Sequence, residues 1–151
     1  MASLHVFSQY DPYYWGGVVI TTSHVLTGAS SFNTMIVTAI TVRVGSTFRT
    51  SGGQVFNYTK LEIHDQHNST TLANDIAIVT IAGSFWGIPN VAPVRLQEYE
   101  LKISETNPVN CFVLGWGDVK SGQLADSLQR SEYILINHQK CEAKWGPRPT
   151  S

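Results

Sequence analysis

Short apolar runs, broken by turn-forming residues, fill the first 82 residues of the chain. The runs are rich in β-branched and aromatic residues, which favour strands over helices. Six strands are predicted, at residues 4–7, 17–20, 24–27, 40–44, 55–58 and 76–81. Six short strands at this spacing suit a small closed antiparallel barrel, because closure removes the exposed edges of an open sheet.

The pattern changes after residue 88. Residues 89–108 have little periodicity and several charges, so they are interpreted as a linker. Two further strands are predicted at residues 110–117 and 128–136, followed by a short helix at 138–145. Two strands cannot close a barrel, and an isolated hairpin is marginally stable at best.

Composition restricts the classes of function. The chain has 151 residues with 42% hydrophobic content, enough for one ordinary core. Its 10 Lys+Arg balance 11 Asp+Glu and form no basic run, which argues against nucleic acid or an anionic membrane as a partner. No apolar run reaches the length of a membrane span, and the first residues lack the basic and apolar regions of a signal peptide.

One motif carries the functional argument. Residues 16–32 read GGVVITTSHVLTGASSF, and they resemble the histidine motif of chymotrypsin-like serine proteases, in which Val-Leu-Thr-Ala-Ala precedes His-Cys. Ser30 stands where the family has its catalytic histidine. The segments Asn74-Asp75-Ile76-Ala77 and Gly115-Trp116-Gly117 extend the resemblance in family-like order and spacing.

The resemblance implies an all-β fold with a chymotrypsin-like antiparallel β-barrel. Residues 1–88 would form the first barrel, essentially complete, and residues 89–108 the inter-barrel linker. Residues 109–151 would form the start of a second barrel, which is only partly present.

Ser30 and Asp75 are the candidate catalytic positions. A hydroxyl cannot replace imidazole, which accepts the proton of the nucleophile and returns it to the leaving group near neutral pH. Asp75 resembles the triad acid, which has no histidine to orient here, so we favour its alternative role as a buried, hydrogen-bonded turn residue. His24, six residues before Ser30, is not expected to replace the histidine. The sequence also contains no Gly-Asp-Ser-Gly-Gly nucleophile motif.

Other candidate chemistry is weaker. His64 and His67 lie three apart, but no cysteine or third histidine is nearby, so a solvated loop is preferred to a metal site. The segment Ser51-Gly52-Gly53 is predicted to be a hairpin turn and not a phosphate-binding loop. No cofactor or metal is expected.

The cysteines and two triplets bear on where the protein works. Cys111 and Cys141 resemble family cysteines whose partners lie further along, and neither partner is in this sequence. A bridge near the histidine is common in the family, and the two corresponding places hold Trp15 and Ser31. The resemblance implies secretion, and Asn57 and Asn68 each begin a glycosylation triplet.

An aromatic cluster is the candidate partner surface. It lies where the family has a loop between its first two strands, and it consists of Tyr10, Tyr13, Tyr14 and Trp15. The preferred alternative is that Trp15 fills the space of the lost bridge while the tyrosines cap the barrel.

The leading hypothesis is a catalytically inactive serine protease homologue, or pseudoprotease, which is secreted and binds a protein partner such as a protease-cascade component. One alternative is a partial sequence of a trypsin-like or chymotrypsin-like endopeptidase. Another is a secreted β-barrel that works alone as an interaction module.

Overall fold

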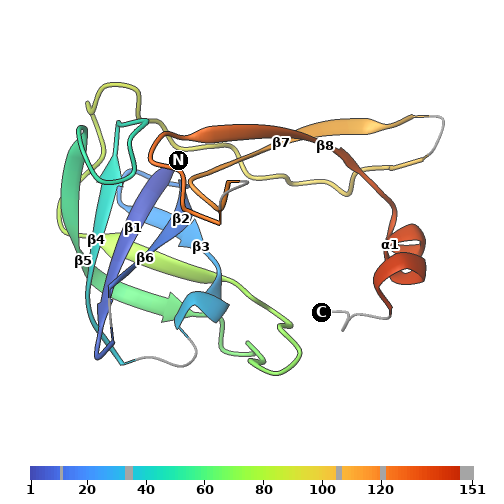
Figure 1. Cartoon of the computed structure of the whole chain (residues 1–151), viewed down its shortest axis with the longest axis horizontal. Helices are drawn as coiled ribbons and strands as arrows, with labels where there is room; N and C mark the ends of the chain where they lie inside the picture. Colours follow the sequence, from blue (N-terminus) through green and yellow to red (C-terminus); the bar gives the residue numbers. More distant parts are fainter. Residues whose placement is uncertain (11, 33–35, 105–106, 120–121, 147–151) are drawn as a thin grey trace.

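Six strands close into an antiparallel barrel in the computed structural model, which describes residues 1–10, 12–32, 36–104, 107–119 and 122–146 (Figure 1). Around the barrel the order of strands is β1-β2-β3-β6-β5-β4. The strands are β1 (Ala2–Ser8), β2 (Tyr13–Val19), β3 (His24–Thr27), β4 (Val37–Val44), β5 (Gln54–Ile63) and β6 (Ala77–Ile81). The predicted all-β class and closed barrel are thus confirmed.

Alternating side chains of the strands fill the barrel. Leu4 and Val6 of β1 are fully buried, as are Ile40 and Val42 of β4, which lie beside them in the β1–β4 ladder. Close packing at the β1–β2 contact requires glycine at position 17, since an added Cβ would lie 2.5 Å from Val25 Cγ1 and 2.6 Å from Leu4 Cδ1. The core is therefore continuous from β1 to its neighbours on both sides.

Four strands, β1, β2, β4 and β5, are longer than predicted, and two of them show why. β2 begins at Tyr13 instead of residue 17, because its aromatic residues pair with β1 from Leu4 to Val6. β5 runs to Ile63 instead of residue 58, because it pairs first with β4 and then with β6. Both extensions depend on long-range pairing, which local propensity does not encode.

The predicted turn at residues 51–53 joins β4 to β5. Gly53 adopts φ +61°, and a Cβ added to it would lie 2.1 Å from the carbonyl oxygen of Val44. Only glycine fits this backbone position.

The second half of the chain forms a separate two-stranded sheet. β7 (Val109–Gly115) and β8 (Gln129–Leu135) pair antiparallel along their whole length. The predicted helix is confirmed as α1 (His138–Trp145), with the Asn137 side chain accepting a hydrogen bond from the Lys140 N–H at its start. β7, β8 and α1 extend away from the barrel (Figure 1). The domain boundaries at residues 88 and 108 stay predictions.

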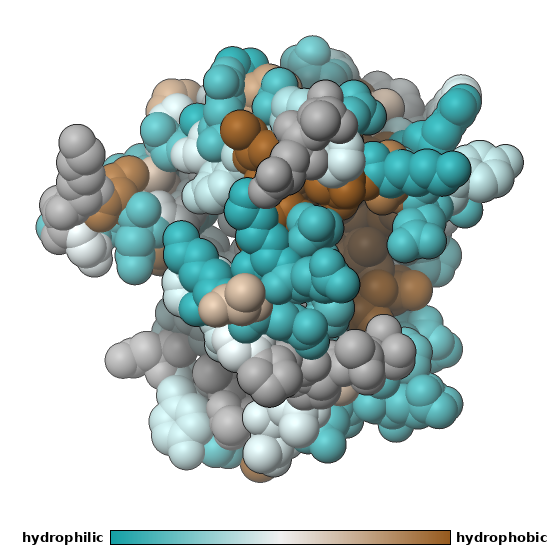
Figure 2. Space-filling model, turned by 90° about the vertical axis from the view of Figure 1, so that its right-hand side faces the viewer, coloured by the Kyte–Doolittle hydropathy of each residue, from teal (hydrophilic) through white to brown (hydrophobic). Residues whose placement is uncertain are grey.

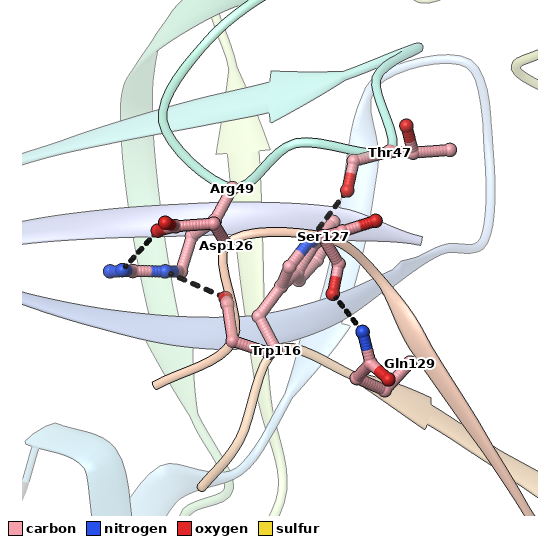
Figure 3. A network of polar contacts seen from close by, with 7 residues as sticks. Thr47, Arg49, Trp116, Asp126, Ser127 and Gln129 are labelled. Carbon is pink, nitrogen blue, oxygen red and sulfur yellow. Dashed lines mark hydrogen bonds and ion pairs between the residues drawn. The ribbon is translucent and has the colours of Figure 1, made fainter. Parts of the chain in front are cut away.

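The described residues of 116–128, that is 116–119 and 122–128, are here called the connecting segment, and they hold this sheet to the barrel (Figure 3). Trp116 is buried, and its indole N–H donates to the carbonyl oxygen of Thr47 at 2.9 Å. The Arg49 backbone N–H donates to the Asp126 carbonyl oxygen at 2.9 Å, and its guanidinium contacts Asp126 Oδ1 at 3.3 Å. These contacts, which join residues 69 and 77 positions apart, therefore fix where β7 ends and β8 starts.

Candidate functional site

The β3–β6 pairing brings Ser30 and Asp75 together. Thr27, the last residue of β3, lies opposite Ala77, the first residue of β6. Ser30 follows in a short 3₁₀ turn, η1 (Ala29–Phe32), while Asp75 lies just before β6. Residues at the two positions predicted for a triad histidine and acid thus meet at one end of the barrel.

Both oxygens of the Asp75 carboxylate accept hydrogen bonds from Ser30. The Ser30 backbone N–H donates to Oδ1 at 2.6 Å, and the Ser30 hydroxyl donates to Oδ2 at 2.8 Å. Such charge-assisted hydrogen bonds are stronger than neutral ones. Ser30 therefore holds the carboxylate in one orientation from two sides.

The carboxylate is exposed, which corrects the expectation that Asp75 is buried. Ser30 offers Asp75 a small hydroxyl where an imidazole ring would cover more of its surface. Partial burial on its own would raise the pKa of Asp75. The hydrogen bonds from Ser30, the charge of His67 and the Ala29 N–H outweigh burial and lower this pKa below its usual value.

This arrangement is poorly suited to acid–base catalysis. A carboxylate with a lowered pKa is a weak base at neutral pH, since efficient general bases have pKa values near the working pH. The Ser30 hydroxyl titrates far outside that range, so neither group can shuttle a proton as imidazole does. What the pair can do is fix the η1 turn against the start of β6.

His24 is remote from this pair, as expected. It lies opposite Thr80 at the far end of the β3–β6 ladder, and its Nδ1 is 2.6 Å from the Thr21 hydroxyl. Since β-strands rise about 3.3 Å per residue, the length of β3 separates His24 from Asp75.

His67 has a role near Asp75 that sequence reasoning missed. Its Nδ1 lies 3.1 Å from the carbonyl oxygen of Ala73 and 3.2 Å from that of Asn74. Because both neighbours are acceptors, Nδ1 carries the proton. The ring therefore supports the chain just before Asp75. The only sequence signal was its position eight residues before Asp75, which is too general to use.

No metal centre is apparent around His64 and His67. His64 Nδ1 accepts the Gln66 N–H at 3.1 Å. Within the described ranges, no three His, Cys, Asp or Glu side chains gather closely enough to hold a metal ion.

β2 divides the aromatic cluster between two faces. Tyr13 and Trp15 lie opposite Val6 and Leu4, so they share the core side of the strand, with their rings in edge contact at 6.1 Å. Tyr14 faces outward and stacks on His5 at 4.4 Å. The side chains exposed to the largest extent are those of Tyr10, at 65%, and Trp15, at 43%.

Tyr13 also reaches the turn that contains Ser30. Its hydroxyl donates to the carbonyl oxygen of Ser31 at 2.8 Å, and Ser31 itself is buried. A side-chain hydrogen bond thus joins β2 to η1, the same two segments that would hold the bridge near the histidine in the family.

The remaining predicted site residues are dispersed. Cys111 in β7 and Cys141 in α1 are free thiols, each partly buried. Asn57 is exposed on β5. Asn68 is exposed too, and its Oδ1 accepts the backbone N–H groups of Thr70 and Thr71, forming a turn.

An apolar groove of about 710 Å³ runs beside Asp75, between the barrel and β7. Its apolar lining includes Leu26, Ile76, Val94 and Leu114. Seen from the side of α1, brown apolar surface is visible in a recess among more hydrophilic surroundings (Figure 2).

In the part of the chain that the structure describes, no helix has the length and apolar character needed to cross a bilayer.

Comparison with known sequences and structures gives a consistent result. The model of the trypsin family matches residues 1–151. Alkaline trypsin B of Manduca sexta is 30% identical over 131 residues, covering 86% of this chain and 50% of the relative. Trypsin Blo t 3 of Blomia tropicalis is 26% identical over 148 residues, covering 96% of this chain and 55% of the relative. The chain therefore spans about half the length of the curated relatives it matches.

Solved structures agree on the fold. HL collagenase superposes with a TM-score of 0.82 at 24% identity, covering 97% of this chain and 62% of that chain. The structure of GrC gives a TM-score of 0.82 at 21% identity, covering 95% of this chain and 63% of that chain. At these identities the likeness concerns the fold alone, and the expected chymotrypsin-like architecture is confirmed.

Proposed function

The chain belongs to the trypsin family, and we propose that it is a catalytically inactive member that acts by binding another protein. The supporting observation is the pairing of Ser30 with Asp75, in which one serine donates to both oxygens of the carboxylate. These are the positions at which the family motif has its catalytic histidine and acid.

Replacement of the catalytic histidine by serine has a large effect on the rate of catalysis. Losing one essential member of a serine-protease triad lowers the rate by roughly six orders of magnitude. Only binding and oxyanion stabilisation then remain. A protein with this defect keeps a protease-like surface, which suits a decoy, a cofactor or a regulator of a protease.

A second candidate function is supported by the coverage of the relatives. Since the chain spans about half of their length, it also fits part of an active trypsin-like endopeptidase. In that case residues beyond this sequence would supply the nucleophile, and a histidine would have to stand at position 30. A third candidate, a barrel working alone as an interaction module, is favoured by the closure of β1–β6 around its own core.

The proposal includes the place of action and the partner surface. Membership of the family supports secretion, with Asn57 and Asn68 as glycosylation sites. The exposed rings of Tyr10 and Trp15 are the part of the aromatic cluster that is open to a partner.

The test uses the protein as isolated from its source. It is incubated with a fluorophosphonate probe, which labels activated serines, and with peptide ester substrates. The proposal expects neither labelling nor turnover. Stoichiometric labelling of a serine, or turnover comparable to that of a trypsin, would support the endopeptidase alternative instead.

A variant sharpens this test. Ser30→His in the 151-residue chain should still have no peptidase activity, because this sequence has no Gly-Asp-Ser-Gly-Gly nucleophile motif. Ser84→His, outside the Ser30–Asp75 pair, is the matched control. Turnover by Ser30→His, absent from Ser84→His, would mean that Ser30 alone prevents catalysis and that another residue supplies the nucleophile.

A further inference from the structure

The apolar groove beside Asp75 meets one edge of β7. Its volume of about 710 Å³ is within the range of ligand-binding sites. On the side of β7 it is lined by three consecutive residues, Phe112, Val113 and Leu114, and no described residue of β8 lines it. Because successive side chains of a strand point to opposite faces, a groove lined by three residues in a row lies along the edge of the strand. This is the edge of β7 that faces away from β8.

That edge of β7 is open to another strand. In the described part of the chain β7 pairs with β8 alone, so the backbone groups of its other edge have no strand partner. Proteins usually protect such an edge with charged side chains, proline or a bulge. β7 has the sequence VNCFVLG, and it pairs with β8 in one continuous register. The edge therefore lacks all three protections and favours an extended polypeptide as its ligand.

The opposite wall of the groove provides a single charge. Asp75 has the only charged side chain among the described residues that line the groove. The pKa of Asp75 lies below its usual value, so the carboxylate is ionised at neutral pH. Among the residues that the structure describes, no lysine or arginine forms an ion pair with it. A ligand of complementary charge carries one basic group.

Gly28 keeps this carboxylate accessible. A Cβ added to Gly28 would lie 3.4 Å from Asp75 Oδ1 and 3.6 Å from Oδ2. Since Gly28 has no side chain, its side of the carboxylate stays uncovered, and Asp75 is exposed. The groove thus combines an open strand edge, apolar walls and an accessible negative charge.

We propose that the groove binds an extended, apolar segment of a protein partner that carries one basic side chain. The segment adds as a strand to the free edge of β7, as in other cases of strand addition. Its apolar side chains pack against Leu26, Ile76 and Val94. Its lysine or arginine pairs with Asp75.

This proposal rests on the proposed function, because it states the chemistry of the partner that a protein-binding member of the family takes. The two can fail separately. Labelling by the fluorophosphonate probe would contradict inactivity and would say nothing against the groove. Peptides that do not bind would contradict the groove and leave the inactivity of the chain unchanged.

Two peptides test the charge by fluorescence anisotropy with the 151-residue chain. One is Val-Leu-Arg-Leu-Val-amide, labelled at its amino terminus, and the other has citrulline, the neutral isostere of arginine, at its centre. The arginine peptide should bind about fivefold more tightly, as expected for an ion pair partly screened by solvent. This preference should disappear in roughly 1 M sodium chloride. Equal binding of the two peptides at low salt would overturn the proposal without the need for any variant.

Variants assign the charge to Asp75. Asp75→Asn should remove the preference for arginine and bind the citrulline peptide as the unaltered chain does, which also shows that the groove is intact. Glu98→Gln removes the same charge from an exposed position outside the groove and should keep the preference. Equal losses of the preference in the two variants, or its survival in Asp75→Asn, would contradict the role of Asp75.

Two measurements test the apolar contacts and the strand addition. Gly-Gly-Arg-Gly-Gly-amide should bind at least about tenfold more weakly than the arginine peptide, because it buries no apolar side chains. NMR of the ¹⁵N-labelled chain should show slower amide exchange in β7 when the arginine peptide binds, with α1 unchanged. Equal binding of the glycine peptide, or unaltered exchange in β7 at saturation, would overturn the proposal.

Sedimentation equilibrium and a small amine test the other possible occupants. The chain should be a monomer, and hexylamine should bind more weakly than the arginine peptide. A dimer that the arginine peptide dissociates would mean that a second copy occupies the groove. Hexylamine binding as tight as that of the peptide would mean a site for small amines. Either result would overturn the proposal.

Discussion

Apolar side chains are buried in the barrel and largely exposed in the β7–β8 sheet. In β4, alternate residues Ile40, Val42 and Val44 are at most 1% exposed. In β7, three consecutive residues, Phe112, Val113 and Leu114, are 42–55% exposed. Since successive side chains of a strand point to opposite faces, both faces of β7 are largely open.

The barrel is therefore stabilised by its own core, whereas the β7–β8 sheet depends on contacts outside itself. A closed barrel buries one face of every strand, so its stability comes from within. A two-stranded sheet has no interior and is marginal by itself. Its position depends on the connecting segment, where Trp116 and Asp126 contact Thr47 and Arg49 of the β4–β5 loop.

Two matched isoleucine-to-alanine substitutions should give the largest difference in the free energy of unfolding. Ile40→Ala removes a fully buried side chain and should lower the free energy of unfolding by about 2–5 kcal/mol. Ile134→Ala in β8, where the side chain is 62% exposed, should change it by less than about 0.5 kcal/mol. Urea unfolding followed by far-UV circular dichroism measures both. Equal losses would mean that the sheet is as well packed as the barrel.

Removing one attachment point should separate the two regions. Trp116→Phe deletes the indole N–H that donates to the Thr47 carbonyl oxygen, at a cost of about 1 kcal/mol. Amide hydrogen exchange should accelerate in β7 and β8 and stay unchanged in β1–β6. Trp145→Phe, at a 65% exposed position of α1, is the control and should alter neither region. Faster exchange throughout the barrel after Trp116→Phe would show that the two regions unfold together.

The smallest expected effect is a change in the pKa of Asp75, which lies in the barrel region. Ser30→Ala removes one of the donors that lower the pKa of Asp75, so this pKa should rise towards its usual value of 3.8. In the native protein, the lowered pKa stabilises the fold above that value, and the contribution is lost as the pH falls through the folded pKa. The variant should therefore lose less stability at acidic pH. Carboxyl ¹³C NMR measures the pKa, and Ser84→Ala should leave it unchanged. An unaltered Asp75 pKa in Ser30→Ala would contradict the assignment of the hydrogen bond.

The sequence predicted the fold where the information was local. Alternation in residues 40–44 and glycines at 52 and 53 marked a strand and a turn, and both are present. The predicted start of β2 is four residues too late, because Tyr13 to Trp15 join a strand only through their pairing with β1. Local patterns do not encode that register.

At the Ser30–Asp75 site, too, local sequence patterns do not encode contacts between distant residues. Motif order predicts that Ser30 and Asp75 stand at the histidine and acid positions, and this assignment stays a prediction. Their direct hydrogen bonds, and the exposure of Asp75, depend on how η1 meets the start of β6. The contacts of Arg49 with Asp126 and of Trp116 with Thr47 join residues that no spacing rule connects.

The hydrogen bond between Tyr13 and Ser31 has a consequence for handling the protein. It joins two barrel segments without sulfur chemistry, and both cysteines of the chain lie after residue 110. Thiol reductants such as glutathione act on disulfides and leave a hydroxyl–carbonyl contact intact. The barrel should therefore reach the same structure in a reducing cytosol and in an oxidising periplasm, so its production needs neither an oxidant nor a disulfide isomerase.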